Sequence, residues 1–189
     1  MAVGILALQG AFAEHGQMLD RLGVEHFEIR QLRDLDKKTD RLILPGGEST
    51  VMTKLLHELG LYEPIKKLIN DGMPVFGTCA GMILLSRDVE DGKPCFGTMD
   101  IRVRRNAYGR QLGSFEATAR FDNSFDFTMT FIRAPYVEAI DDSAKNNVRV
   151  LAEYDGKIVG VQYKNQIGLA FHPELDDDTR IHERFLEMI

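Results

Sequence analysis

The stretch VFGTCAGMILLS, residues 75–86, places a cysteine where a buried strand gives way to a buried helix. Its first residues follow the turn pair Asp71-Gly72 as a short apolar run, and a second apolar run follows Cys79. Strand, sharp turn and helix, with small residues on either side of a nucleophile, have the geometry of a nucleophile elbow. Glycines suit such a turn because it carries strained dihedral angles and leaves no room beside the sulfur. The amino end of the helix would favour the thiolate, so Cys79 is the candidate nucleophile, with a buried core cysteine as the alternative.

The chain on the amino-terminal side of this junction alternates between apolar runs and helical patterns. We expect strands at 3–8, 24–29 and 41–47, and helices at 13–23, 49–59 and 62–71. Such alternation predicts an α/β fold: a three-layer sandwich with helices on both faces of a mostly parallel sheet.

The second half of the chain is richer in strands. They are expected at 100–105, 114–121, 128–134, 148–163 and 166–171. Asp155-Gly156 marks a hairpin turn. In the closing segment Ile181, Phe185 and Ile189 form one helical stripe that would face the core. We therefore expect an antiparallel, strand-rich appendage to the parallel sheet.

Composition excludes several classes of function. The chain has 189 residues and a net charge of -6, so it lacks the basic excess that nucleic acids or an anionic membrane surface would require. No apolar run reaches 18 residues, and the apolar amino terminus lacks the basic region of a signal peptide and is interpreted as the first strand. Two cysteines, Cys79 and Cys95, are too few for a disulfide scaffold and favour a reducing, cytoplasmic setting.

A candidate base for the cysteine follows the last predicted strand, in GLAFHPEL, residues 168–175. Pro173 favours an extended conformation at His172, which would place the side chains of His172 and Glu174 on the same side. A carboxylate so placed can hold the imidazole tautomer and support its charged form. Both Cys79 and His172 are expected at the carboxyl ends of parallel strands, where catalytic loops of α/β sheets gather. The alternative is a histidine that only ends a strand.

A third motif is LILPGGEST, residues 42–50. Two glycines after an apolar strand leave backbone N–H groups unobstructed, and Ser49 or Thr50 is expected to cap the following helix. The lysine and spacing of a Walker loop are missing. Beside a thiol nucleophile, the favoured interpretation is an oxyanion hole made by the N–H groups of Gly47 and Ala80. A plain turn remains the alternative for Gly46.

The other histidines are interpreted as surface or packing residues. His15 and His57 fall in helical patterns, His26 in a strand and His182 in the closing helix. None is spaced with Cys95 as metal ligands usually are, so no metal site is expected.

Together, PGGEST, GTCAG and FHPEL, in this order, give the chain a resemblance to the triad-type (class I) glutamine amidotransferases. It is most similar to one branch, the glutaminase subunits of bacterial-type pyridoxal 5′-phosphate synthase. The stretches that carry this similarity are LALQGAFAEH (6–15), RNAYGRQ (105–111), SFEA (114–117) and FIRAP (131–135). The resemblance spans essentially the full chain and implies a single amidotransferase domain over residues 1–189 with a flavodoxin-like architecture.

The resemblance also implies an activity. L-glutamine would be hydrolysed to L-glutamate and ammonia, with Cys79 as nucleophile, His172 as general base and then acid, and Glu174 as the orienting carboxylate. The ammonia would pass, shielded from water, to a barrel-fold synthase subunit that makes pyridoxal 5′-phosphate, and the two subunits would form a large ring-shaped hetero-oligomer. No metal or cofactor is implied. Because unpartnered hydrolysis wastes glutamine, we expect the oxyanion hole to be completed only when the partner binds.

For the glutamine backbone, the resemblance implies a set of binding residues: Gly47, Glu48, Ser49, Arg105, Ile132 and Arg133. Two arginines suit an amino acid carboxylate because the guanidinium fork matches it. We interpret Arg102 and Arg104 instead as part of a solvated strand face. Gln9 is similar to a family position near the oxyanion region and the partner surface.

Three alternatives remain at this point. The chain could be a free-standing cysteine hydrolase or amidase of the same fold, which would be fully active alone and show no preference for glutamine. It could serve a different synthase, although RNAYGRQ and FIRAP favour the vitamin B6 branch. A non-catalytic binding subunit is disfavoured because Cys79, His172 and Glu174 are all present.

Overall fold

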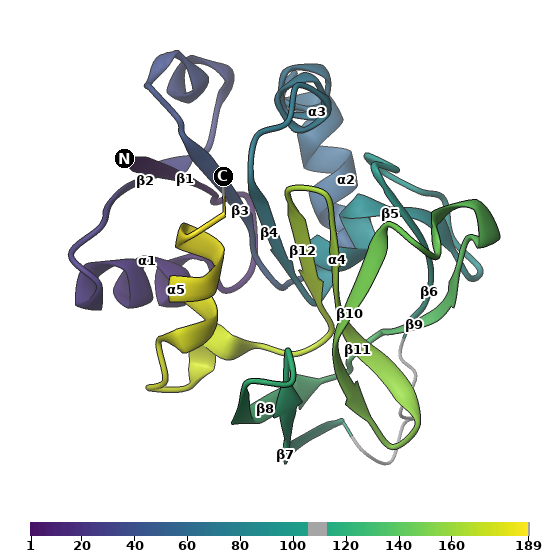
Figure 1. Cartoon of the computed structure of the whole chain (residues 1–189). Coiled ribbons are helices and arrows are strands. Elements are labelled where there is room, and N and C mark those ends of the chain that lie inside the picture. Colours follow the sequence, from purple (N-terminus) through teal and green to yellow (C-terminus); the bar gives the residue numbers. More distant parts are fainter. Residues whose placement is uncertain (106–112, 189) are drawn as a thin grey trace.

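The structure, a computed structural model that describes residues 1–105 and 113–188, is built around one large sheet (Figure 1). The parallel part of this sheet has the spatial order β2 (Glu25–Ile29), β1 (Ala2–Leu6), β3 (Arg41–Leu44), β4 (Val75–Thr78) and β12 (Gln166–Leu169). The carboxyl ends of these strands therefore lie along the same edge, as the alternating pattern in the sequence predicts.

Antiparallel strands continue the sheet from β12. They are, in spatial order, β11 (Lys157–Tyr163), β10 (Val148–Tyr154), β7 (Ser114–Phe121) and β8 (Phe125–Ile132). Asp155 and Gly156 join β10 to β11 with φ angles of 50° and 68°, which confirms the predicted hairpin turn.

A side branch joins the sheet at β11. It contains β5 (Ser86–Val89), β6 (Met99–Arg104) and β9 (Tyr136–Ile140). The sequence pattern predicts β6 but misses β5 and β9. Both are short, and β5 begins directly where a helix ends, so neither leaves room for a clear period-two pattern.

Helices cover both faces of the parallel strands, which confirms the three-layer prediction (Figure 1). One face carries α1 (Phe12–Arg21) and α5 (Arg180–Leu186), and the other carries α2 (Ser49–Glu58), α3 (Tyr62–Asn70) and α4 (Ala80–Leu85). Short 3-10 turns are η1 (Leu32–Asp36), η2 (Asp142–Ala144) and η3 (Pro173–Leu175). None of the helices in the described ranges is both long and apolar enough to cross a lipid bilayer.

One helix prediction needs correction, and another is confirmed where the structure describes it. Glu48, not Ser49 or Thr50, is the N-cap residue of α2, and no side chain caps this helix end; Ser49 is already helical, and its carbonyl accepts a hydrogen bond from Thr53. In α5 the predicted stripe is buried at Ile181 and Phe185, whereas Ile189 lies outside the described residues.

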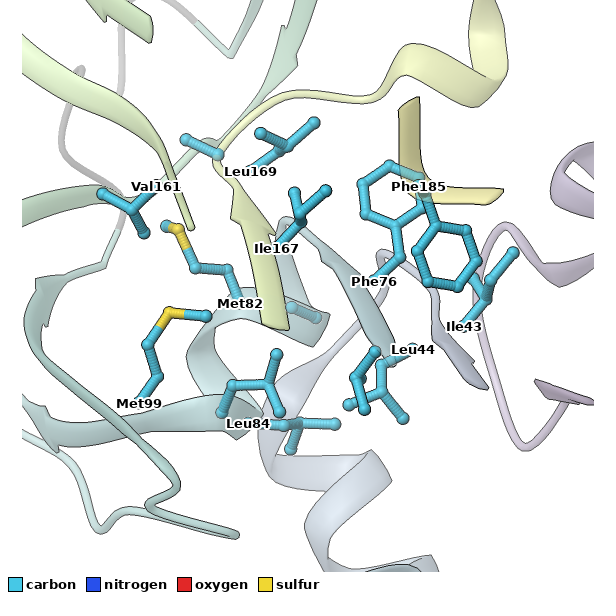
Figure 2. Packing of buried hydrophobic residues seen from close by; sticks show 14 of the residues in the cluster. Ile43, Leu44, Phe76, Met82, Leu84, Met99, Val161, Ile167, Leu169 and Phe185 are labelled. Atoms are coloured by element: carbon cyan, nitrogen blue, oxygen red, sulfur yellow. The ribbon is translucent and has the colours of Figure 1, made fainter. Parts of the chain in front are cut away.

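The core fixes β4 from both sides (Figure 2). Phe76 packs against Phe185 of α5, with ring centroids 5.3 Å apart, while Met82 and Leu84 of α4 are buried on the opposite face. Burying each large apolar side chain contributes about 1.5–3 kcal/mol. The strand that leads into Cys79 is thus among the most firmly held parts of the molecule.

Candidate active site

Cys79 occupies a strained turn between β4 and α4. Its φ and ψ angles are 48° and −100°, a combination that residues with a Cβ atom rarely adopt. Its backbone N–H donates to the carbonyl of Leu169 at 2.7 Å, which ties the turn to the end of β12. This is the strand–turn–helix geometry that the elbow motif predicts.

The flanking glycines serve a different purpose from the one expected. Neither Gly77 nor Gly81 has a positive φ, so the strained dihedral angles belong to Cys79 itself. A Cβ atom on Gly77 would lie 2.7 Å from the carbonyl carbon of Gly81, and one on Gly81 would overlap the carbonyl oxygen of Leu44. The glycines therefore allow α4 to approach β3 and β4 closely.

His172 and Glu174 lie beside the elbow because β12 pairs with β4. His172 Nδ1 and Glu174 Oε1 are 2.7 Å apart, and the imidazole is also hydrogen-bonded to the Cys79 thiol. The two side chains meet as predicted, but through the 3-10 turn that begins at Pro173 and not through an extended backbone.

Burial and hydrogen bonding set the charges of this pair. Burial lowers the pKa of His172, but the hydrogen bonds with Cys79 and Glu174 outweigh it and raise that pKa to about 10. Burial likewise opposes ionisation of Glu174, yet neighbouring His15 and the hydrogen bond from His172 hold the carboxyl pKa below its ordinary value. The arrangement favours an imidazolium held by a carboxylate.

A cavity of about 300 Å³ opens above the cysteine. Besides Cys79 and His172, its lining contains the other predicted residues Gln9, Gly47, Glu48, Ser49, Arg105, Ile132 and Arg133. Ala80 and Glu174 do not line it: Ala80 is the first residue of α4, and Glu174 lies behind the imidazole. Residues from five separate segments, predicted from scattered motifs, thus surround one thiol.

A family model described as the SNO glutamine amidotransferase family matches residues 5–189. The chain belongs to this family. The amidotransferase resemblance inferred from the three motifs is thereby confirmed, and the cavity around Cys79 is the candidate active site of a glutamine amidotransferase.

Relatives of this amidotransferase include two proteins that carry the name pyridoxal 5′-phosphate synthase subunit PdxT. The one from Methanocorpusculum labreanum is 59% identical over 189 residues, covering 100% of this chain and 98% of the relative. The one from Desulfitobacterium hafniense (strain DSM 10664 / DCB-2) is 52% identical over 190 residues, covering 100% of this chain and 94% of the relative.

Solved structures agree with the fold. A crystal structure of a glutamine amidotransferase, 39% identical in sequence, superposes with a TM-score of 0.89 and covers 98% of this chain and 97% of its own. PurLQS from Thermotoga maritima, at 17% identity, has a TM-score of 0.68 over 98% of this chain and 96% of its own, and shares the fold.

The oxyanion donors predicted for this amidotransferase lie on the loop after β3 and at the first residue of α4. Gly47 follows β3 and lines the cavity. Ala80 is the first residue of α4, so its N–H has no hydrogen-bond partner within the helix. Gln9 reaches across from the loop after β1, and its Oε1 accepts a hydrogen bond from the Glu48 N–H at 2.6 Å.

The arginines of this region fall into two groups, on a strand face and in the cavity, as the sequence predicts. Arg102 and Arg104 pair with Glu138, at 3.1 Å and 2.7 Å, and with carboxylates of β5 and its following turn, so they belong to a solvated strand face. Arg105 instead lines the cavity and donates to the carbonyl of Asp91 at 3.1 Å. The rest of the RNAYGRQ motif, residues 106–111, lies outside the described residues.

Metal-binding side chains do not gather anywhere in the described ranges 1–105 and 113–188, where no group of three or more His, Cys, Asp or Glu residues could hold an ion. Cys95 is a buried free thiol whose pKa is raised by burial.

Two histidines that sequence reasoning set aside lie directly behind the site. His15 of α1 and His182 of α5 are fully buried and hydrogen-bonded to one another, and His15 also contacts Thr78 and Glu174. The sequence contains an indication that His15 is buried. It precedes Met18 and Leu19 by three and four residues and so shares their buried helix face. A buried imidazole on such a face needs polar partners.

Proposed function

We propose that this chain is the glutaminase subunit of a pyridoxal 5′-phosphate synthase, a single amidotransferase domain that hydrolyses L-glutamine to L-glutamate and ammonia. The observation that carries this proposal is the strained Cys79 at the floor of a cavity, hydrogen-bonded to His172, which is in turn held by Glu174. Full-length similarity to proteins named PdxT supports the assignment to this synthase.

The chemistry follows from these three side chains. The Cys79 thiolate attacks the carboxamide carbon of glutamine and forms a carbon–sulfur bond. His172, charged and held by Glu174, gives its proton to the departing nitrogen, so the carbon–nitrogen bond breaks and ammonia leaves. The neutral imidazole then takes a proton from water, whose oxygen attacks the thioester and releases glutamate and the thiolate.

Two backbone donors would stabilise the oxyanion of each tetrahedral intermediate. They are the N–H groups of Gly47 and Ala80, one on each side of the thiol. The α-carboxylate and α-amino group of glutamine would be held by the other cavity residues, with Arg105 and Arg133 supplying positive charge and Glu48 negative charge. Ser49 and Ile132 also line this cavity.

The ammonia would be delivered to a barrel-fold synthase subunit, within a ring-shaped hetero-oligomer in the cytoplasm, without a metal or cofactor on this chain. In the structure of the free chain Gln9 is bound to the Glu48 N–H beside Gly47. We infer that docking of the synthase subunit against the Gln9 loop completes the oxyanion hole and switches hydrolysis on.

The test is glutamate release from glutamine by the purified chain, with and without the synthase subunit. Activity that appears or rises sharply with the partner supports the proposal. Equal activity in both samples, or hydrolysis of peptides but not of glutamine, would point to a free-standing hydrolase. Cys79→Ala should abolish glutamate release yet still bind the synthase subunit in sedimentation, and normal release by this variant would refute the nucleophile assignment.

A further inference from the structure

A line of buried polar contacts runs from the candidate site into the core. His15 Nδ1 lies 3.0 Å from His182 Nε2, and His15 Nε2 lies 3.1 Å from Thr78 Oγ1 and 3.5 Å from Glu174 Oε2. Thr78 Oγ1 in turn lies 3.5 Å from Glu174 Oε1, the oxygen that His172 contacts. His15 of α1 thus contacts the carboxylate behind the imidazole, and His182 of α5 contacts His15 in turn.

This line is shielded from water. His15, His182 and Thr78 have no exposed surface, and both imidazoles pack nearly perpendicular to the ring of Phe76, at 5.8 Å and 5.4 Å between centroids. Burial lowers the pKa of His15 and lowers that of His182 to about 3, so both imidazoles are neutral. Each neutral imidazole carries one N–H and one bare nitrogen, and the tautomer decides which atom can donate.

One pair of tautomers gives every close contact in this line one hydrogen-bond donor and one acceptor. If His182 carries its proton on Nε2, it donates to a bare His15 Nδ1, and His15 Nε2–H then points at Thr78 Oγ1 and Glu174 Oε2. The Thr78 hydroxyl is left free to donate to Glu174 Oε1. His182 Nδ1, which has no partner in the described part of the chain, is then a bare nitrogen and not a buried, unpaired N–H.

The opposite pair of tautomers leaves two buried polar atoms without a suitable hydrogen-bond partner within the ranges that the structure describes. A proton on His15 Nδ1 would force one onto His182 Nδ1, where the described residues offer no acceptor. It would also turn a bare His15 Nε2 towards Glu174 Oε2, an oxygen that has no close hydrogen-bond donor among the described residues. A buried carboxylate oxygen facing a lone pair is strongly unfavourable.

We propose that His15 is a positioning residue of the amidotransferase, which donates from Nε2–H to the Thr78–Glu174 pair and is fixed in that tautomer by His182. This role rests on the proposed function of Cys79, His172 and Glu174. His15 does not line the cavity, so it acts through the carboxylate. By supporting the charge on Glu174, it keeps the imidazole of His172 charged and aimed at the thiol.

Two isosteric substitutions separate a positioning role from a packing role. In His15→Gln the amide nitrogen can occupy the place of Nε2 and still donate to Thr78 and Glu174, whereas in His15→Asn the amide reaches only the place of Nδ1. Both variants are polar and smaller than histidine. We expect His15→Asn to lower kcat by about 10- to 100-fold with little change in KM, and His15→Gln to retain most of the activity.

A second readout needs neither glutamine nor the synthase subunit. Alkylation of Cys79 by iodoacetamide, followed by mass spectrometry of its peptide from the full chain, reports how well His172 activates the thiol. Alkylation at neutral pH should slow in His15→Asn and not in His15→Gln, and its pH profile should move only in His15→Asn. The groups facing His15 are Thr78, Glu174, His172, His182 and, on its own helix, Glu14. The matched control is the pair His57→Asn and His57→Gln on the exposed face of α2.

The outcomes are distinct. Equal losses in the two His15 variants, or no loss in a folded His15→Asn, would show that His15 only fills space. A chain that shows the alkylation pattern but does not hydrolyse glutamine even with the synthase subunit present would retain the positioning role and refute the proposed function. If neither variant folds, long-range ¹⁵N–¹H spectra of the wild-type imidazoles still decide: a proton on Nε2 of both His15 and His182 supports the proposal, and one on His15 Nδ1 overturns it.

Discussion

The backbone of Gly46 lies directly against the imidazole of His172. A Cβ atom at position 46 would overlap Cε1 of this ring and would lie 2.9 Å from Nδ1. The loop after β3 therefore forms a wall that helps to fix the imidazole between Cys79 and Glu174. The sequence leaves Gly46 open to interpretation as a plain turn residue, and the structure gives it this packing role as well.

Gly46→Ala should therefore damage catalysis more than folding. The added methyl group would push the imidazole away from the thiol, and a displacement of about 1 Å in a catalytic group can cost about 100-fold in rate. We expect kcat for glutamine hydrolysis to fall by about that factor, with an overpacking cost of about 1–3 kcal/mol in urea unfolding. Gly113→Ala is the control, because no atom of the described residues lies within 4 Å of a Cβ atom there. An unchanged kcat in Gly46→Ala would show that the ring has room to move.

The parts of the site that sequence reasoning found are those fixed by local patterns. Cys79, Gly47 and His172 each follow a predicted strand, and parallel strands bring such positions to one edge of the sheet. The Glu174 contact was also local, since Glu174 lies two residues from His172. Local spacing could therefore predict the three side chains, although not the 3-10 turn that joins the last two.

The parts it missed depend on distant contacts. His15 and His182 meet across 167 residues of sequence, and no pattern along the chain pairs a residue of the first helix with one of the last. The strain at Cys79 was missed for a different reason. The motif indicates a tight turn, but which residue carries the positive φ depends on how closely α4 packs on β3, and this appears only in three dimensions.

That strain predicts an unusual order of stability among variants of Cys79. A positive φ outside the common regions costs about 1–3 kcal/mol for a residue with a Cβ atom, and glycine avoids most of this cost. Cys79→Gly should therefore be more stable than Cys79→Ala by about 1–2 kcal/mol, even after the greater flexibility of unfolded glycine is included. Urea unfolding followed by circular dichroism measures the difference.

Cys95 supplies the control for this order. It is also a buried free cysteine, but it is not among the residues with positive φ. Cys95→Gly should be less stable than Cys95→Ala, by about 0.5–1 kcal/mol. The same order at both positions would mean that the backbone at Cys79 is not strained.

The charge on His172 predicts a loss of stability at alkaline pH. Because the folded pKa of about 10 lies above the ordinary value of 6.5, the folded chain holds this proton more tightly than the unfolded chain. The resulting stabilisation is fully present below about pH 6.5 and is lost as the pH rises through about 10. Each pH unit within that window removes up to about 1.4 kcal/mol.

Unfolding of the wild type and of His172→Gln, measured from pH 6 to pH 10.5, should therefore show two curves that converge as the pH rises. Taking the difference cancels the titration of lysines and tyrosines common to both chains. His57→Gln, which removes an exposed imidazole, should follow the wild type. Parallel curves for the wild type and His172→Gln would show that the imidazole is not charged in the folded chain.

Arg105 should determine how tightly glutamine is held. It lines the cavity beside Ser49, and among the described residues its guanidinium donates to the carbonyl of Asp91, so its fork can also reach a substrate carboxylate in the cavity. Lysine keeps the charge but cannot form the paired hydrogen bonds, so Arg105→Lys should raise KM by about 10-fold or more with kcat nearly unchanged. Initial rates of glutamate release in the presence of the synthase subunit measure both constants.

Arg102→Lys is the matched control. The guanidinium of Arg102 pairs with Asp88 and Glu138 on the strand face, so this substitution should leave KM unchanged. If Arg105→Lys also leaves KM unchanged, the carboxylate is held elsewhere, and Arg133, which lines the same cavity, becomes the residue to test.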